Sequence, residues 1–180
     1  MIPPILSEGI REMLIINRNT GMMIERQMLY EAEQYTPMMD YMIKVIDLMK
    51  TPGVRLYMSV NSRSVKKAIK EFKHQQVDAD LSEHSNAFYI NLSKKFRHIL
   101  MQPKQRKTKY FLIDIDTKEL TTITDVLAFL TERKIMQITN YETPNGHHVI
   151  CDPFNLNELK RENVEIKTDG LMLLYSGRAE

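Results

Sequence analysis

The stretch FLIDID, residues 111–116, constrains the fold more than any other part of the chain. Its apolar residues lead into two aspartates spaced two residues apart. In an extended chain, Ile113 and Ile115 face one side of a sheet while Asp114 and Asp116 face the other. The stretch therefore predicts a β-strand with one apolar face in a core and one acidic face.

The two aspartates need either solvent or a positive partner. Like charges about 6–7 Å apart repel by a few kcal/mol at an effective dielectric near 20, so both carboxylates are solvated, one pKa rises, or a cation is held. Mg²⁺ and Mn²⁺ suit one or two carboxylates that share them with phosphate oxygens. An equally open interpretation is that both are solvated or capping groups at a strand end, before an ordinary turn at Thr117.

Hydrophobic periodicity and turn residues predict an α+β fold in which strands and helices mix without strict alternation. No internal repeat or domain boundary is visible, so we expect one domain over 1–180, with an N-terminal hairpin and helix in 1–53 and a core in 54–180. The predicted strands cover 13–18, 22–30, 54–60, 111–116, 135–142, 147–151, 164–167 and 171–175. The predicted helices cover 36–51, 64–75, about 87–100, 123–134 and 155–161.

Composition limits the class of protein. A chain of 180 residues with 43% hydrophobic and 27% charged residues is long enough for one real core and has the balance of an ordinary globular protein. The net charge of +2 calls for no nucleic-acid partner by itself, so any such surface is local. The single cysteine, Cys151, excludes an internal disulfide. With no signal-like start and no membrane-length apolar run, we expect a cytoplasmic protein that does not bind membranes.

The turn TPNG, followed by HHVI, is the second informative segment. Pro144 and Asn145 are typical turn residues, and Gly146 allows another group to approach the backbone closely. One interpretation is a hairpin turn with two exposed histidines. The other is that Gly146 leaves room for a phosphate and His148 donates to it near the aspartates.

Together these motifs resemble the catalytic core of the archaeo-eukaryotic primase superfamily, over roughly residues 109–175. The apolar strand ending in Asp114 and Asp116 is similar to that family's first motif, and Thr143, Gly146 and His148 are similar to its second. The third motif, an apolar residue followed by an acid, matches Glu165, with Asp169 as the alternative. The chain is also similar to short uncharacterised proteins of tailed phages that share RLYMSVNSR, DID, TPNGHHVICDPFN and LLY, which would place it in a host cytoplasm.

The resemblance implies an RRM-like mixed or antiparallel sheet with helices packed mainly on one face. It implies a metal-dependent nucleotidyltransferase of primase-polymerase type, acting in DNA replication on nucleoside triphosphates and single-stranded or primed nucleic acid. The implied metal, Mg²⁺ or Mn²⁺, is held by Asp114, Asp116 and Glu165, with His148 as the fourth catalytic residue. The implied nucleotide- and phosphate-binding residues are Arg55, Asn61, Arg63, Asn145, Gly146 and Lys167.

Two other functions stay open at this point. The interval from His148 to Glu165 is shorter than in replicative primases, which favours a non-catalytic nucleotide- or nucleic-acid-binding phage factor. The same carboxylates would also suit a metal-dependent phosphodiesterase or nuclease.

Two basic segments are ambiguous in the same way. In YMSVNSRS, residues 57–64, a strand leads into a helix that Ser64 can cap, and a helix start with basic donors suits a phosphate. The alternative is a capped helix with arginines facing solvent. The run QPKQRKTK, residues 102–109, is either a solvated loop or a positive surface beside the aspartate strand that suits a nucleic-acid backbone.

Overall fold

The computed structural model describes residues 10–30, 47, 50–82 and 85–177. Their strands form two antiparallel four-stranded sheets, in the orders β2-β1-β3-β8 (the first sheet) and β5-β6-β4-β7 (the second sheet). The first sheet comprises β1 (Ile10–Asn17), β2 (Met22–Tyr30), β3 (Val54–Ser59) and β8 (Leu171–Ser176). The second comprises β4 (Phe111–Ile115), β5 (Gln137–Glu142), β6 (His147–Cys151) and β7 (Val164–Lys167).

The α+β class and the antiparallel pairing are confirmed, but the strands divide between two sheets where one was expected. The described helices are α2 (Val65–Asp80), α3 (Ser85–Tyr89), α4 (Leu92–Leu100) and α5 (Leu120–Glu132). Two short 3-10 turns are also present, Pro103–Gln105 between α4 and β4 and Leu156–Glu158 between β6 and β7. The helix expected near 87–100 is thus two helices, and that expected at 155–161 is one short turn. The helix predicted for 36–51 lies almost wholly outside the described residues.

The predicted N-terminal hairpin is present. The Asn17 side chain accepts hydrogen bonds from the backbone N–H groups of Asn19 (3.0 Å) and Thr20 (3.4 Å). These hydrogen bonds from the Asn17 side chain stabilise the turn that connects β1 to β2. Gly21, at φ +69°, supplies the left-handed conformation that the turn requires.

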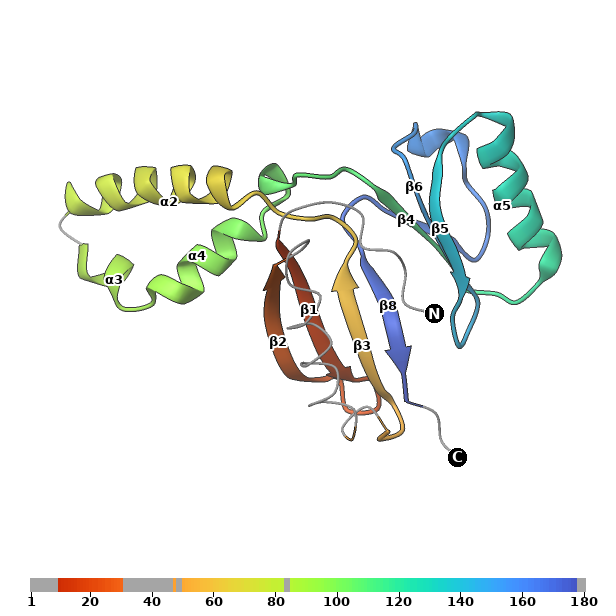
Figure 1. Ribbon diagram of the computed structural model, residues 1–180, viewed down its shortest axis with the longest axis horizontal. Coiled ribbons are helices and arrows are strands. Elements are labelled where there is room, and N and C mark those ends of the chain that lie inside the picture. Colours follow the sequence, from red (N-terminus) through yellow and green to blue (C-terminus); the bar gives the residue numbers. More distant parts are fainter. Residues whose placement is uncertain (1–9, 31–46, 48–49, 83–84, 178–180) are drawn as a thin grey trace.

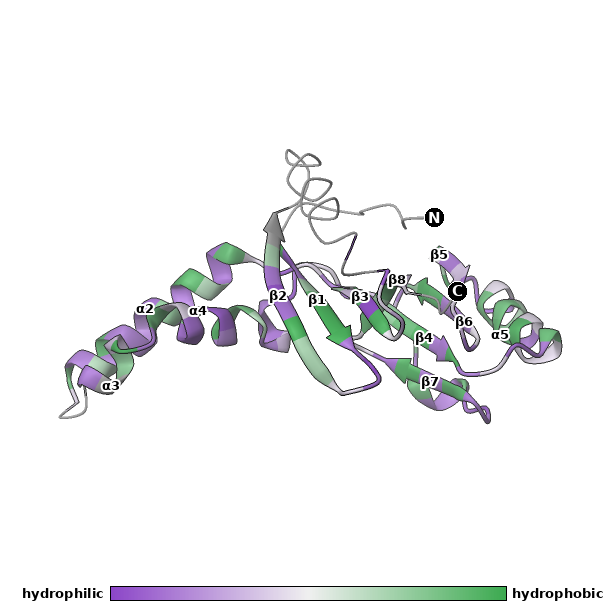
Figure 2. Cartoon of the chain, turned by 90° about the horizontal axis from the view of Figure 1, so that it is seen from below, coloured by the Kyte–Doolittle hydropathy of each residue, from purple (hydrophilic) through white to green (hydrophobic). Residues whose placement is uncertain are grey.

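The apolar faces of the two sheets share one core. Met13, Leu56 and Met58 of the first sheet pack in the same buried cluster as Leu112 and Ile150 of the second. Figure 2 shows the apolar stretches along β1 and β4 that supply part of it. The acidic face of β4 therefore looks toward the first sheet, because Leu112 and Asp114 lie two residues apart on one strand.

The opposite face of the second sheet is covered by α5 (Figure 1). Val126 and Leu130 of the helix pack against Ile113, Ile115 and other apolar residues of the sheet. The alternation in FLIDID is thus explained, since the isoleucines lie under the helix while Asp114 lies on the other face. Helix α5 begins after the turn that follows β4.

Helices α2, α3 and α4 form an arm, inserted between β3 and β4, that projects from the sheets (Figure 1). Ser64 caps α2 by accepting a hydrogen bond from the backbone N–H of Lys67 (3.3 Å). Inside the arm, the ring of Phe72 lies 5.3 Å from that of Phe88 and 5.7 Å from that of Phe96, centroid to centroid. These aromatic contacts join the three helices into one unit.

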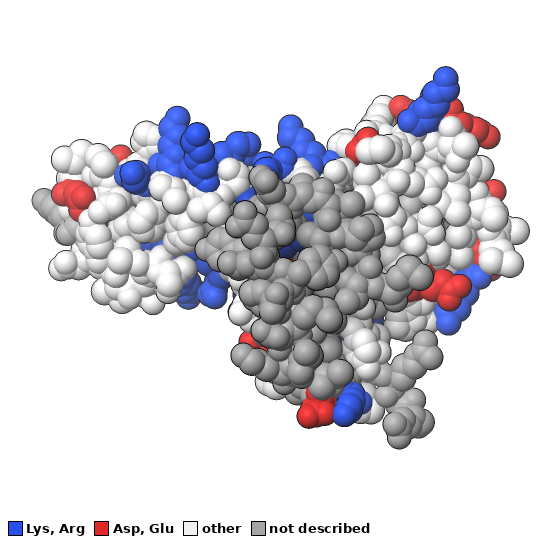
Figure 3. Space-filling view, viewed as in Figure 1, with Lys and Arg blue, Asp and Glu red and all other residues white. Residues whose placement is uncertain are grey.

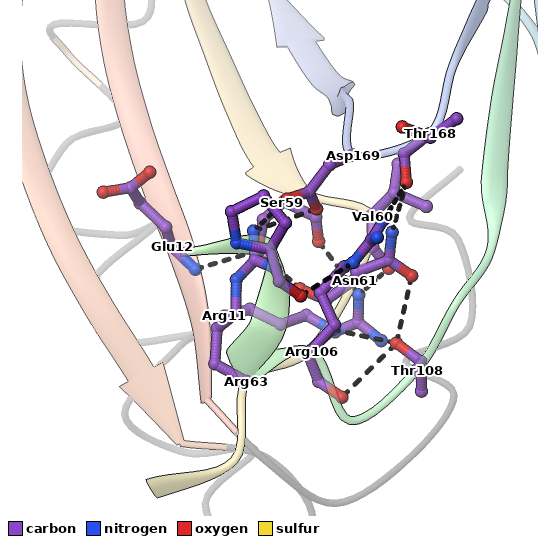
Figure 4. Close-up of polar contacts among 12 residues, drawn as sticks. Arg11, Glu12, Ser59, Val60, Asn61, Arg63, Arg106, Thr108, Thr168 and Asp169 are labelled. Atoms are coloured by element: carbon purple, nitrogen blue, oxygen red, sulfur yellow. Dashed lines mark hydrogen bonds and ion pairs between the residues drawn. The ribbon is translucent and has the colours of Figure 1, made fainter. Parts of the chain in front are cut away.

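The arm meets the sheets at a buried polar junction (Figure 4). The segments that enter and leave the arm run side by side, with Ser64 N–H donating to the Gln105 carbonyl and Lys107 N–H donating to the Ser62 carbonyl, each at 2.8 Å. Asn61 is fully buried there. Polar groups inside a protein cost free energy unless they are hydrogen-bonded. The hydrogen bonds of the junction therefore fix where the arm joins the sheets.

Candidate functional site

Four polar side chains lie in register across the second sheet. Asp114 of β4 is directly opposite His148 of β6 on one side and Glu165 of β7 on the other. Tyr141 of β5 is in turn opposite His148. Directly opposed residues of antiparallel strands share a face. With Lys167, which lies on that face two residues beyond Glu165, these residues form what we call the polar row.

Hydrogen bonds connect the row from Tyr141 to Asp114. The Tyr141 hydroxyl lies 3.0 Å from Nδ1 of His148, and Nε2 of His148 lies 3.0 Å from Oδ1 of Asp114. This arrangement suits an imidazole that accepts from the tyrosine and donates to the carboxylate. Tyr141 also packs against the core that the two sheets share. Burial raises the pKa of Tyr141, which keeps the hydroxyl protonated as a donor.

An ammonium group occupies the other end of the row. Nζ of Lys167 lies 2.6 Å from Oδ2 of Asp114 and 3.0 Å from Oε2 of Glu165. Burial disfavours the charged lysine, but its hydrogen bonds to the two carboxylates outweigh burial and raise the pKa of Lys167. The His148 hydrogen bond is the main reason that the pKa of Asp114 falls from 3.8 to about 2, with Lys167 adding to it against the effect of burial. Asp114 is therefore ionised and already neutralised by its neighbours.

Two of the three predicted metal ligands, Asp114 and Glu165, come together, and the third, Asp116, does not join them. Asp116 lies beyond the end of β4, where its backbone N–H donates to the Asn163 carbonyl (2.8 Å), and it is exposed. Both carboxylate oxygens of Asp114 are engaged. In the described part of the chain, no group of three or more His, Cys, Asp or Glu residues could hold a metal ion. The residues present do not fit Mg²⁺ or Mn²⁺ without rearrangement, because these ions need a set of oxygen ligands.

The glycine of the β5–β6 turn has a structural reason of its own. A Cβ atom on Gly146 would lie 2.8 Å from the backbone nitrogen of Thr117 and still closer to the carbonyl oxygen of Ile115. The Thr143 hydroxyl accepts from the Gly146 N–H (3.1 Å) and closes the turn, while Asn145 is exposed at its tip. The expectation that Gly146 leaves room for a phosphate is corrected here, because the end of β4 fills that space.

Two predicted phosphate-binding residues lie in the junction instead of the polar row (Figure 4). Asn61 uses all its hydrogen-bonding capacity internally. Its Nδ2 donates to the carbonyls of Tyr110 (2.9 Å) and Thr168 (3.2 Å), and its Oδ1 accepts from the Tyr110 N–H (2.7 Å) and the Thr108 hydroxyl (3.3 Å). No donor of Asn61 is left for a phosphate.

Arg63 is 3% exposed and its Nη2 lies 2.9 Å from both carboxylate oxygens of Asp169. It neither faces solvent nor reaches the polar row. The pairing also separates the two acids considered for the third motif, since Asp169 belongs to the junction while Glu165 lies beside Asp114.

A cleft adjoins the polar row at Tyr141. It has a volume of about 1560 Å³ and is lined by the β1–β2 turn, the start of β3, the end of β8 and the β5–β6 turn. Its described charged residues are Arg18, Lys50, Arg55, Lys118 and one acid, Glu142. We call it the basic cleft.

Of these cations, only Arg55 was predicted from the sequence as a phosphate-binding residue. No local sequence pattern indicates that Arg18 and Lys118 lie in the same cleft as Arg55. The four cations come from three segments of the chain, at residue 18, residues 50–55 and residue 118, which only the tertiary fold brings together. Lys50 is paired with Asp47 at 2.7 Å. Within the described residues, Arg18, Arg55 and Lys118 form no ion pair, so their charges face the cleft uncompensated.

Comparison of the chain with protein-family models, curated proteins and solved structures gives no match. The resemblance to the primase superfamily is therefore carried by the motifs alone. Among the described helices, none has the length and apolar character needed to cross a bilayer.

Proposed function

We propose that this protein binds a nucleotide or a nucleic acid, with the phosphates of the ligand in the basic cleft. The observation that carries the proposal is the meeting of Arg18, Lys50, Arg55 and Lys118 in one hollow that contains a single described carboxylate, Glu142. Lys50 is paired with Asp47. Arg18, Arg55 and Lys118 form no ion pair within the described residues, and an anionic ligand would relieve the repulsion between their charges.

The chemistry of the lining suits such a ligand. Guanidinium groups such as those of Arg18 and Arg55 donate paired hydrogen bonds to phosphate oxygens. Tyr141 and Tyr175 line the same hollow, and aromatic rings are a usual platform for a base. Its volume also exceeds the roughly 300–1,000 Å³ of typical small-molecule pockets, so a whole nucleotide has room.

Calorimetry with the full-length protein tests this proposal. Nucleoside triphosphates and short single-stranded oligonucleotides would be titrated in the presence of EDTA, so that binding is measured apart from metal-dependent turnover. We expect saturable binding that weakens about tenfold or more in the double variant Arg18→Gln/Arg55→Gln, because each charge-assisted hydrogen bond contributes about 1.5–3 kcal/mol.

The matched control is Lys134→Gln/Lys160→Gln, which removes the same charge from exposed positions outside the cleft. It should bind as the unmodified protein does. Absence of saturable binding, or equal weakening in both double variants, would contradict the proposal.

A second candidate is the nucleotidyl transfer that the motif resemblance implies. It is favoured by one observation, the opposition in register of Asp114, His148 and Glu165 on a face that adjoins the cleft. The obstacle is Lys167, which neutralises both carboxylates. Incubation with Mn²⁺, labelled nucleotides and primed or single-stranded templates distinguishes the candidates. Product that requires Asp114 selects transfer, cleaved template selects nuclease activity, and binding without either selects the first proposal.

A further inference from the structure

The helical arm carries a charge that the composition of the whole chain conceals. Between Arg63 and Lys109 there are twelve basic and four acidic residues, a net charge of +8. The rest of the chain has thirteen basic and nineteen acidic residues, a net charge of −6. The total of +2 is therefore the sum of two large and opposite regional charges, and the basic one coincides with the insertion between β3 and β4.

Helix α2 presents lysines on the side that points away from its partner helix. Lys66, Lys70 and Lys73 follow the i, i+4, i+7 spacing that places them on one helix face, and all three are exposed. Ala68 is fully buried and packs with α4 at the base of the arm, and Phe72 packs against the aromatic rings of α3 and α4. The apolar face of α2 is thus turned inward and its lysines outward.

The basic surface continues from α2 along the segment that leads to β4. Figure 3 shows lysine and arginine side chains gathered along the upper edge of the molecule, over α2 and this segment. We call the exposed lysines of the two elements the lysine face; they are Lys66, Lys67, Lys70, Lys73, Lys104, Lys107 and Lys109.

Within the described residues, few acidic side chains neutralise the lysine face. Glu71 lies 2.9 Å from Nζ of Lys104 and also accepts from Gln75, so its charge is engaged. Asp78 and Asp80 lie in the last turn of α2, at the outer end of the arm. Among the described residues, Lys66, Lys67, Lys70, Lys73 and Lys109 form no ion pair, so their charges are available to an anionic partner.

We propose that the lysine face binds the phosphate backbone of a nucleic acid without reading its sequence. Backbone recognition requires a row of cations that can each replace a counterion, and exposed lysines at helical spacing provide one. A membrane surface is the less suitable partner. Ile69, at 42% exposed, lies among the inner lysines, but Val77, Leu81 and Ile90 lie toward the outer end of the arm. The described part of the lysine face therefore carries one exposed isoleucine and not the broad apolar face that membrane binding requires.

The inference is independent of the proposed cleft ligand, because the lysine face and the basic cleft share no residue. The two sites also come from different parts of the fold, the arm for one and the space between the sheets for the other. Loss of one kind of binding therefore leaves the other measurable.

The test is fluorescence anisotropy of the full-length protein with a labelled single strand and a labelled duplex over a range of salt concentrations. The variant is Lys66→Gln/Lys70→Gln/Lys73→Gln, which keeps good helix formers and removes three charges. On duplex DNA we expect the slope of log affinity against log salt to become shallower by about 3, since each lysine–phosphate contact contributes about 1. At low salt, binding should weaken at least about tenfold.

The matched control is Lys134→Gln/Lys160→Gln/Arg161→Gln, an equal charge change at exposed positions outside the arm. It should keep the salt slope of the unmodified protein on duplex DNA. Equal slopes for the arm variant and the unmodified protein would overturn the inference. So would binding to phosphatidylserine vesicles together with no binding to either nucleic acid. Circular dichroism of each variant verifies that the helices are intact.

Discussion

Nε2 of His148 lies 3.0 Å from Oδ1 of Asp114, from the directly opposite position on the neighbouring strand. Two residues 34 positions apart in sequence are thereby held as a charge-assisted pair inside a continuous row that runs to Tyr141 on one side and Lys167 on the other. The pair joins the first two predicted catalytic motifs, and the row reaches the cleft at Tyr141.

The first prediction concerns acid stability. The pKa of Asp114 is about 2 in the folded protein against an ordinary 3.8, so the carboxylate stabilises the fold fully above pH 3.8 and loses that contribution as the pH falls to about 2. Asp114→Asn should lower the free energy of unfolding at neutral pH by about 1–2 kcal/mol, allowing for the screening of a partly exposed pair. Urea unfolding at a series of pH values measures this.

The difference between the unmodified protein and Asp114→Asn should shrink across that same acidic interval. The control is Asp116→Asn, which changes an exposed carboxylate and should alter stability by less than about 0.5 kcal/mol. A difference that does not depend on pH would show that His148 and Lys167 do not stabilise the charge of Asp114.

The second prediction concerns the ammonium of Lys167. Lys167→Met removes the positive charge between Asp114 and Glu165 but keeps a side chain of similar length. We expect a loss of about 1 kcal/mol in stability, because two carboxylates at opposed strand positions then repel. The freed carboxylates should attract a cation, so MgCl₂ or MnCl₂ should raise the melting temperature of the variant more than that of the unmodified protein.

Lys160→Met, at an exposed position away from the row, is the control for that experiment and should not gain metal-dependent stability. An equal response of all three proteins to divalent salt would mean that Lys167 does not compete with a cation. A large response of the unmodified protein would favour the nucleotidyltransferase candidate.

The third prediction concerns the β5–β6 turn. Gly146→Ala places a methyl group against the Thr117 nitrogen and the Ile115 carbonyl, both of them backbone atoms that cannot rotate away. We expect a loss of about 2–3 kcal/mol in the free energy of unfolding, measured by denaturant titration.

Gly21→Ala provides the comparison, since a Cβ there meets open space and only the φ of +69° is unfavourable. Its expected cost is about 1 kcal/mol. If Gly146→Ala were no more destabilising than Gly21→Ala, the close approach of the turn to the end of β4 would be wrong.

The fourth prediction concerns the junction of the arm. Asn61→Ala deletes a fully buried amide and leaves the backbone N–H and carbonyl of Tyr110 without their partner, while the Thr168 carbonyl still accepts from Arg106. Each unsatisfied buried group costs about 1–3 kcal/mol, so we expect a loss of at least about 2 kcal/mol. Denaturant unfolding measures the loss, and Asn145→Ala, at the exposed tip of a turn, should cost far less. A cost below about 1 kcal/mol would contradict the bonded network around Asn61.

Much of the secondary structure could be predicted because its signals are local. The alternation in FLIDID, the turn residues after Asn17 and the cap at Ser64 each act within a few residues, and the corresponding elements are present. The division of the strands between two sheets was not predictable, since alternation shows that a strand has an apolar face but not which sheet covers it.

The candidate site was predictable only in part, for a related reason. Asp114, His148 and Glu165 were expected near one another from the order of their motifs, and the pairing of the strands brings them together. Asn61 and Arg63 were expected at a phosphate because they precede a helix. Their burial depends on contacts with residues far along the chain, which no local pattern reveals.

The sequence by itself determined the identity of the strands, the apolar and acidic faces of β4, and the strong positive charge of the segment that forms the arm. Only the tertiary structure decided that Lys167 lies between Asp114 and Glu165, that Asp169 pairs with Arg63, and that cations from three distant segments line one cleft. The reason is physical. Backbone preference and side-chain alternation act between near neighbours, whereas strand register and charge convergence depend on packing between residues that are distant in the chain.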